Sequence, residues 1–91
     1  MIRSFKDKDT EAVFNGSHSR RLPTDIQRSA RRRLLHLDSV GALEDLRQPP
    51  SNRFEALQGL QGRYSIRIND QWRITFGWSN GPSDVKIEDY H

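Results

Sequence analysis

The feature that most constrains the fold of this 91-residue chain is a pair of alternating stretches in its last third. Apolar and polar residues alternate from Tyr64 to Ile68 and again from Trp72 to Trp78. A period of two is typical of a strand that buries one face and exposes the other. The two stretches therefore predict a pair of antiparallel strands joined by a short loop.

The residue order also fixes how these two strands pair. A two-residue turn would set polar residues of one strand against apolar residues of the other, although directly opposed side chains share a face. A three-residue loop, 69–71, resolves the conflict by pairing Ile66 with Ile74. On the polar face, the same register places Arg67 directly opposite Arg73.

Two opposed arginines need a compensating negative charge, because like charges in this position destabilise a sheet. One candidate source is an acidic neighbour such as Glu55 or Glu88, and another is a phosphodiester bound to this face. Arginine suits the second alternative because its planar guanidinium donates two parallel hydrogen bonds to a phosphate. On that alternative, we expect the guanidinium groups to be presented to solvent.

The remaining elements follow from periodicity and turn residues. Helices are predicted over 7–15 and from Pro23 to about Gly41, with Ile26, Ala30, Leu34 and Leu37 on one face of the second. Short strands are predicted over 2–5, 54–58 and 84–90, and one further helical turn over 42–46. This order predicts a single α+β domain over residues 1–91, with two N-terminal helices on one face of a small antiparallel sheet.

The charge pattern favours an anionic partner. Twelve arginines and three lysines face twelve acids, and the segment 20–33 alone carries six arginines and one aspartate. Such a run is consistent with RNA, DNA or an acidic protein as partner, and equally with a solvated helix face. The chain has no cysteine, three scattered histidines and no long apolar stretch, so we expect a cytoplasmic protein without metal or cofactor.

RNA cleavage without a metal needs three groups: a base for the 2′-hydroxyl proton, a cation for the developing phosphorane charge, and an acid for the 5′-oxygen. Arg73 and Arg67 are candidate cations. His91 titrates in the useful range, and Tyr90, Asp89 or Glu55 are candidate assistants. Taken alone this set is not diagnostic, because charged and aromatic residues are common on small sheets.

Four segments together resemble the HigB toxins of the RelE/ParE superfamily, the plasmid maintenance killer proteins. They are MIRSFKDKDTEAVF at the start, RQPPSNRFEALQG, the hairpin GRYSIRINDQWRITFGW, and VKIEDYH at the end. The resemblance implies a RelE/ParE-like α+β fold and an endonuclease that acts on mRNA engaged by the ribosome. It also implies a HigA-like helix-turn-helix antitoxin, through whose complex with the toxin the operator DNA is bound.

The resemblance also implies site residues. Arg73, Asp89, Tyr90 and His91 match the family pattern, whereas Glu55 and Gln58 stand where that pattern has a histidine and a lysine. Glu55 is then a candidate general base, and the missing cation must come from another arginine. The full set of expected RNA-binding residues is Arg67, Arg63, Arg53, Arg31 and Arg32.

Two other functions fit the same fold less well. In the ParE branch of the superfamily, toxins of this fold poison DNA gyrase by binding it, and the terminal residues then need no catalytic role. Direct binding of operator DNA by the basic helix is less favoured, because no second helix follows it at helix-turn-helix spacing.

Overall fold

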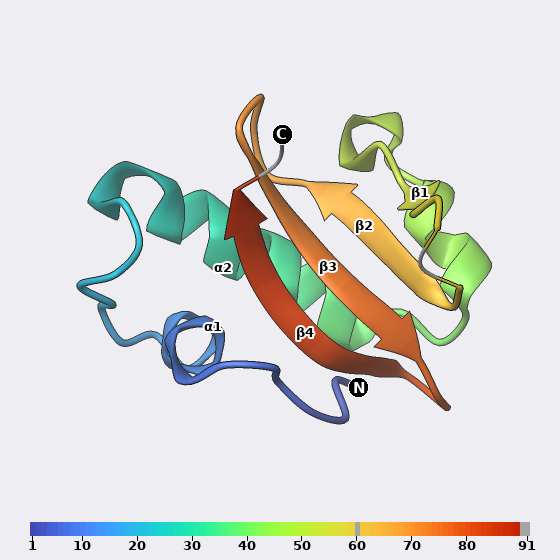
Figure 1. Ribbon diagram of the computed structural model, residues 1–91, viewed down its shortest axis with the longest axis horizontal. Helices are drawn as coiled ribbons and strands as arrows, with labels where there is room; N and C mark the ends of the chain where they lie inside the picture. Colours follow the sequence, from blue (N-terminus) through green and yellow to red (C-terminus); the bar gives the residue numbers. More distant parts are fainter. Residues whose placement is uncertain (60, 90–91) are drawn as a thin grey trace.

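The computed structural model describes residues 1–59 and 61–89 and consists of a four-stranded sheet with helices against one face (Figure 1). In chain order its elements are α1 (Lys8–Phe14), α2 (Thr24–Ser39), the 3₁₀ helices η1 (Leu43–Arg47) and η2 (Pro50–Asn52), β1 (Glu55–Ala56), β2 (Arg63–Arg67), β3 (Trp72–Trp78) and β4 (Pro82–Asp89). The strands lie in the order β1-β2-β3-β4, and each neighbouring pair is antiparallel. The predicted α+β arrangement is confirmed.

The predicted register of the central hairpin is also confirmed. Ile66 pairs with Ile74, and Arg67 pairs with Arg73. The three-residue loop is held by Asn69, whose Oδ1 accepts hydrogen bonds from the backbone N–H groups of Gln71 and Trp72, both at 2.8 Å. An asparagine side chain that takes up two backbone donors in this way fixes the turn, and therefore the register.

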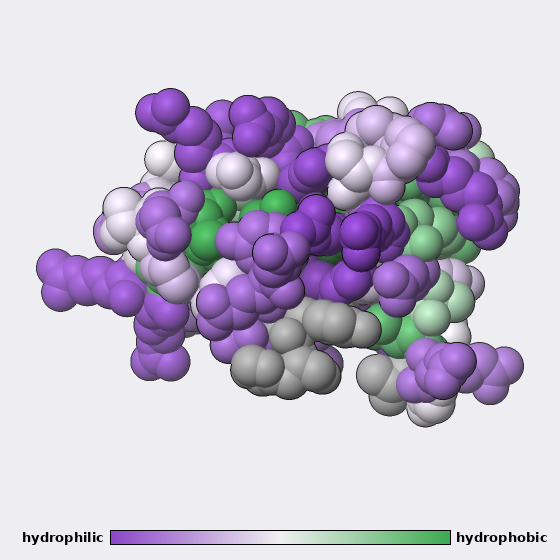
Figure 2. Space-filling model, turned by 90° about the horizontal axis from the view of Figure 1, so that it is seen from above, coloured by the Kyte–Doolittle hydropathy of each residue, from purple (hydrophilic) through white to green (hydrophobic). Residues whose placement is uncertain are grey.

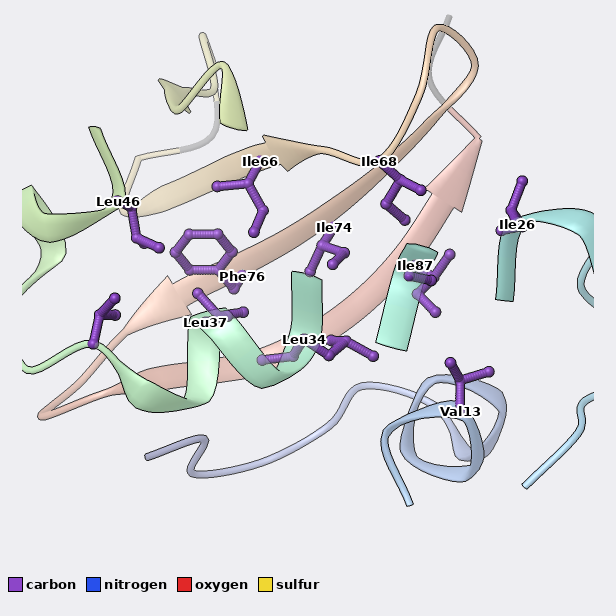
Figure 3. Packing of buried hydrophobic residues seen from close by; sticks show 13 residues of the cluster. Val13, Ile26, Leu34, Leu37, Leu46, Ile66, Ile68, Ile74, Phe76 and Ile87 are labelled. Carbon is purple, nitrogen blue, oxygen red and sulfur yellow. The ribbon is translucent and has the colours of Figure 1, made fainter. Parts of the chain in front are cut away.

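The core lies between α2 and the sheet. The helical face predicted to be apolar is buried along its whole length, from Ile26 to Leu37. Opposite it, Ile66, Ile74 and Phe76 are fully buried, and Figure 3 shows them on the side of the sheet that faces α2, with Phe76 next to Leu37. A helix whose apolar residues recur every three to four positions packs in this way on the apolar side of a sheet.

α1 packs against α2 and closes the β4 edge of the sheet. The carboxylate of Asp7 caps its first turn by accepting from the N–H of Thr10 at 2.8 Å. The buried Thr10 hydroxyl in turn accepts from the backbone N–H of Ile87 at 2.9 Å. The residues before α1 also bind to the β4 edge, since the Lys6 N–H donates to the Val85 carbonyl at 2.9 Å.

Three predicted boundaries were wrong. The strand over 2–5 is reduced to a single parallel bridge between Phe5 and Val85, because the chain turns directly into α1. The strand over 54–58 retains only Glu55–Ala56, since Arg53 before it has a left-handed φ of 43° and a turn with Gly59 at φ 77° follows. The last strand begins at Pro82, two residues earlier than predicted.

The opposite face of the sheet is not covered by any helix among the described residues (Figure 1). Viewed from the end that carries the β2–β3 loop, the surface is mainly hydrophilic, with small hydrophobic areas between the charged side chains (Figure 2). No helix within 1–59 and 61–89 has the length and apolar composition needed to cross a membrane.

Candidate functional site on the open face of the sheet

Polar side chains from all four strands share the open face of the sheet. Alternation along the strands and the observed register bring together Glu55, Arg63, Ser65, Arg67, Arg73, Thr75, Lys86 and Glu88. Val85 and Ile87 lie in the core. Because side chains alternate along a strand, Lys86 and Glu88 therefore lie on the polar face. The face is therefore built by the same alternation that builds the core.

Arg73 is held within this face and is only 7% exposed. Its Nη1 donates to the hydroxyl of the buried Ser65 at 3.3 Å, and its Nη2 lies 3.5 Å from Oε1 of Glu55. The expectation that this guanidinium is presented to solvent was therefore wrong. The ion pair still borders the surface, because 47% of the Glu55 side chain is exposed.

The opposed arginines are compensated by acidic neighbours. Arg73 is paired with Glu55, as one of the two alternatives predicted, while Arg67 is paired with Asp70 of the β2–β3 loop. Asp70 is almost fully exposed, and the Arg67 side chain retains 29% exposure. The two guanidinium groups are thus directed to different carboxylates, which relieves their repulsion.

A pair of hydroxyl groups forms the centre of the site. Ser65 and Thr75 are directly opposed on β2 and β3. Arg73 donates to Ser65, and Nη2 of Arg63 donates to Oγ1 of Thr75 at 3.3 Å. Thr75 donates its own proton to Glu88. These two hydroxyls were not among the predicted site residues, although the register that places Arg67 opposite Arg73 already implied that Ser65 faces Thr75.

The other predicted catalytic residues are only partly placed. Asp89 pairs with Trp72, so its side chain starts on the side of the strand opposite to Arg73, and its Oδ2 accepts from Nε2 of Gln71 at 3.1 Å. Tyr90 and His91 lie outside the described residues.

The remaining predicted RNA-binding residues lie elsewhere. Arg53 is exposed at the turn before β1. Arg31 and Arg32 are on the outer face of α2. A cleft of about 530 Å³ lies there, lined by Arg28 and Leu35 of α2, by Val13 of α1 and by His18 of the loop between the two helices. Because α2 packs its other face on the sheet, these arginines do not join Arg73.

The chemistry that this arrangement supports is anion binding coupled to proton transfer. A fixed guanidinium stabilises negative charge, and a half-exposed carboxylate beside it accepts a proton. Among residues 1–59 and 61–89, no group of three or more histidines or acids is arranged to hold a metal ion.

Comparison with known proteins shows the family to which the chain belongs. The model of the HigB-like toxins, described as RelE-like toxins of type II toxin–antitoxin systems, matches residues 3–91. The chain is 45% identical to Toxin HigB-1 of Vibrio cholerae over 83 residues, which cover 89% of this chain and 87% of that protein. It is 28% identical to Endoribonuclease HigB of Proteus vulgaris over the full length of both. The chain belongs to the HigB-like family of RelE-like toxins of type II toxin–antitoxin systems.

Proposed function

We propose that the protein is a toxin that cleaves mRNA engaged by the ribosome, without a metal ion. The observation that carries the proposal is the Arg73–Glu55 pair on the open face of the sheet, where a cation and a candidate base lie 3.5 Å apart. Family membership supports it, as does the name of the relative from Proteus vulgaris, an endoribonuclease.

In the proposed reaction, the 2′-oxygen of the RNA attacks the adjacent phosphorus. Glu55 takes the 2′-hydroxyl proton, the new P–O2′ bond forms, and the P–O5′ bond breaks as the 5′-oxygen receives a proton. The products are a 2′,3′-cyclic phosphate and a free 5′-hydroxyl. Arg73 stabilises the charge that develops on the phosphorane, while its bond to Ser65 keeps it in place.

Binding of RNA exchanges one anion for another. The guanidinium of Arg73 has five donors, so a phosphate replaces Glu55 without disturbing the bond to Ser65. Displacement frees the carboxylate as a base. We assign the acid role to His91, with Tyr90 and Asp89 assisting, by their match to the family pattern.

The cations outside the Arg73–Glu55 pair have two roles in this proposal. Arg53, Arg63 and Arg67 are the candidates for the cation that Gln58 does not provide near the cleavage site. On α2, Arg31 and Arg32 contact the RNA of the ribosome. Phosphate contacts of this kind supply affinity without sequence preference, and they weaken as salt is added.

Membership of the family implies an antitoxin partner. We propose that this partner is a HigA-like helix-turn-helix protein, that operator DNA is bound only through the complex of the two, and that the toxin acts in the cytoplasm. A reading frame for such a protein next to the toxin gene would support this part of the proposal.

The test is to map the 5′ ends of transcripts after brief expression of the toxin. New ends within translated regions are expected, and they should be absent when Arg73 is replaced by glutamine. Intact messages together with DNA damage would contradict the proposal and favour the gyrase-binding mode of the ParE branch.

A further inference from the structure

We propose that Arg63, held in place by Thr75 and the carbonyl of Asp84, forms a second phosphate subsite, which binds the RNA phosphate next to the one that is cleaved. This inference rests on the proposed nuclease function. Arg53, Arg63 and Arg67 were the alternatives for the cation that Gln58 does not provide. The hydrogen bonds of Arg63 on the sheet favour Arg63 among them.

Arg63 differs from the other arginines of this face in its partners. Its guanidinium donates to two neutral oxygens, Thr75 Oγ1 at 3.3 Å and the carbonyl of Asp84 at 3.1 Å. Arg67 and Arg73 each have a carboxylate partner, whereas within the described part of the chain no carboxylate lies within 4 Å of Arg63. Its positive charge is therefore held in place but not neutralised, which suits an incoming anion.

The Thr75 acceptor of Arg63 is itself oriented. A hydroxyl has one proton, and Thr75 gives it to Glu88, whose carboxylate can only accept. The lone pairs of Thr75 are left for Arg63. Glu88 is therefore a positioning residue. It forms an ion pair with Lys86, whose Nζ lies 3.8 Å from Oε1 of Glu88.

The backbone next to Arg63 departs from regular strand pairing. A register irregularity interrupts the β3–β4 pairing beside Gly77, and on β4 Asp84 has a left-handed φ of 47°. A Cβ at Gly77 would lie 3.0 Å from the Ser83 hydroxyl and 3.7 Å from Nη1 of Arg63. Strained backbone of this type is concentrated at functional sites.

The guanidinium groups of Arg63 and Arg73 lie near each other on the sheet. Ser65 and Thr75 are directly opposed, which places their Cβ atoms about 5 Å apart. One guanidinium is bonded to each hydroxyl, so Arg73 and Arg63 lie on the order of 10 Å apart on one open surface. A single RNA strand lying across this surface then meets the two cations at separate phosphates.

The experiment is a double-mutant cycle in which one change is Arg63→Gln in the protein and the other is removal of one phosphate charge from the mRNA. Cleavage is measured on ribosomes that carry this mRNA. Single-turnover cleavage is compared for ordinary mRNA and for two mRNAs in which the phosphate on one or the other side of the cleaved bond is a neutral methylphosphonate. For the wild type, we expect one substitution to slow cleavage at least tenfold. For Arg63→Gln, cleavage of ordinary mRNA should be slowed by a similar factor, and the same methylphosphonate should slow it no further.

Two further variants make the result specific. Thr75→Val keeps the charge of Arg63 but removes its acceptor, and it should lose most of the sensitivity to methylphosphonate. Arg67→Gln removes a cation from the same strand and should keep that sensitivity. Thermal unfolding of each variant checks that the fold is intact.

The outcomes distinguish failure of the subsite from failure of the nuclease function. If Arg63→Gln remains as sensitive as the wild type to both methylphosphonates, the second subsite is refuted while the nuclease stands. If Arg67→Gln alone becomes insensitive, the subsite belongs to Arg67. If the wild type cleaves no message at all, the proposed function itself fails.

Discussion

The molecule has two arginine-rich surfaces, and they are organised in opposite ways. On the outer face of α2, Arg28, Arg31 and Arg32 are exposed, and the hydrogen bonds of the last two are to a backbone carbonyl and a serine hydroxyl. On the open face of the sheet, Arg73 is 7% exposed and is held by a buried hydroxyl and a carboxylate. Arginines that extend into solvent supply attraction, whereas arginines that are fixed in place can stabilise a charge at one point.

Replacing Arg73 by glutamine should produce the largest effect. The variant removes the cation that stabilises the phosphorane, and the loss of one such group slows an enzyme by about 10²–10³-fold. Single-turnover cleavage on programmed ribosomes measures this change. Arg73→Lys is the matched control, since it keeps the charge but loses the planar fork, and it should restore only part of the rate.

Glu55→Gln should separate binding from chemistry. The amide cannot take the 2′-hydroxyl proton, so the plateau rate should fall about 10²-fold. In the wild type the Glu55 carboxylate lies 3.5 Å from Arg73 and competes with phosphate for it. The neutral amide does not compete in this way, so RNA should bind to the variant at least as tightly as to the wild type. A rate equal to that of the wild type at saturating RNA would remove Glu55 from the role of base.

The arginines of α2 should affect the strength and salt dependence of ribosome binding, and not the rate of the cleavage step. Changing Arg28, Arg31 and Arg32 together to glutamine should weaken ribosome binding and lower its salt dependence, by about 0.7–0.9 in log–log slope for each phosphate that is no longer neutralised. Titrating the variant against ribosomes at several salt concentrations gives the slope. An unchanged slope would show that this face does not bind phosphates.

Asp70→Asn should have the smallest effect. Asp70 is nearly fully exposed, and an exposed ion pair such as Arg67–Asp70 contributes about 0–1 kcal/mol, so the free energy of unfolding should hardly change. The released cation of Arg67 should tighten RNA binding slightly. Urea denaturation and an RNA-binding titration check both statements; a decrease of several kcal/mol would mean that this pair holds the hairpin.

The sequence was informative where periodicity and turn chemistry act locally. The alternation on either side of Asn69 predicted the register, and the register placed Arg67 opposite Arg73. It could not show that Arg73 is buried, because that depends on Ser65 from a neighbouring strand and on Glu55 from a strand only two residues long. The role of Thr75 was missed for the same reason, since its partners come from β2 and β4.

The arginines of α2 are thus expected to govern binding to the ribosome, and the arginines of the sheet to govern cleavage. The decisive experiment measures the single-turnover cleavage rate against ribosome concentration for wild type, Arg73→Gln and the triple α2 variant. We predict a lower plateau with an unchanged half-saturation point for Arg73→Gln, and an unchanged plateau with a higher half-saturation point for the α2 variant. The reverse assignment, or a normal plateau for Arg73→Gln, would contradict this division of roles.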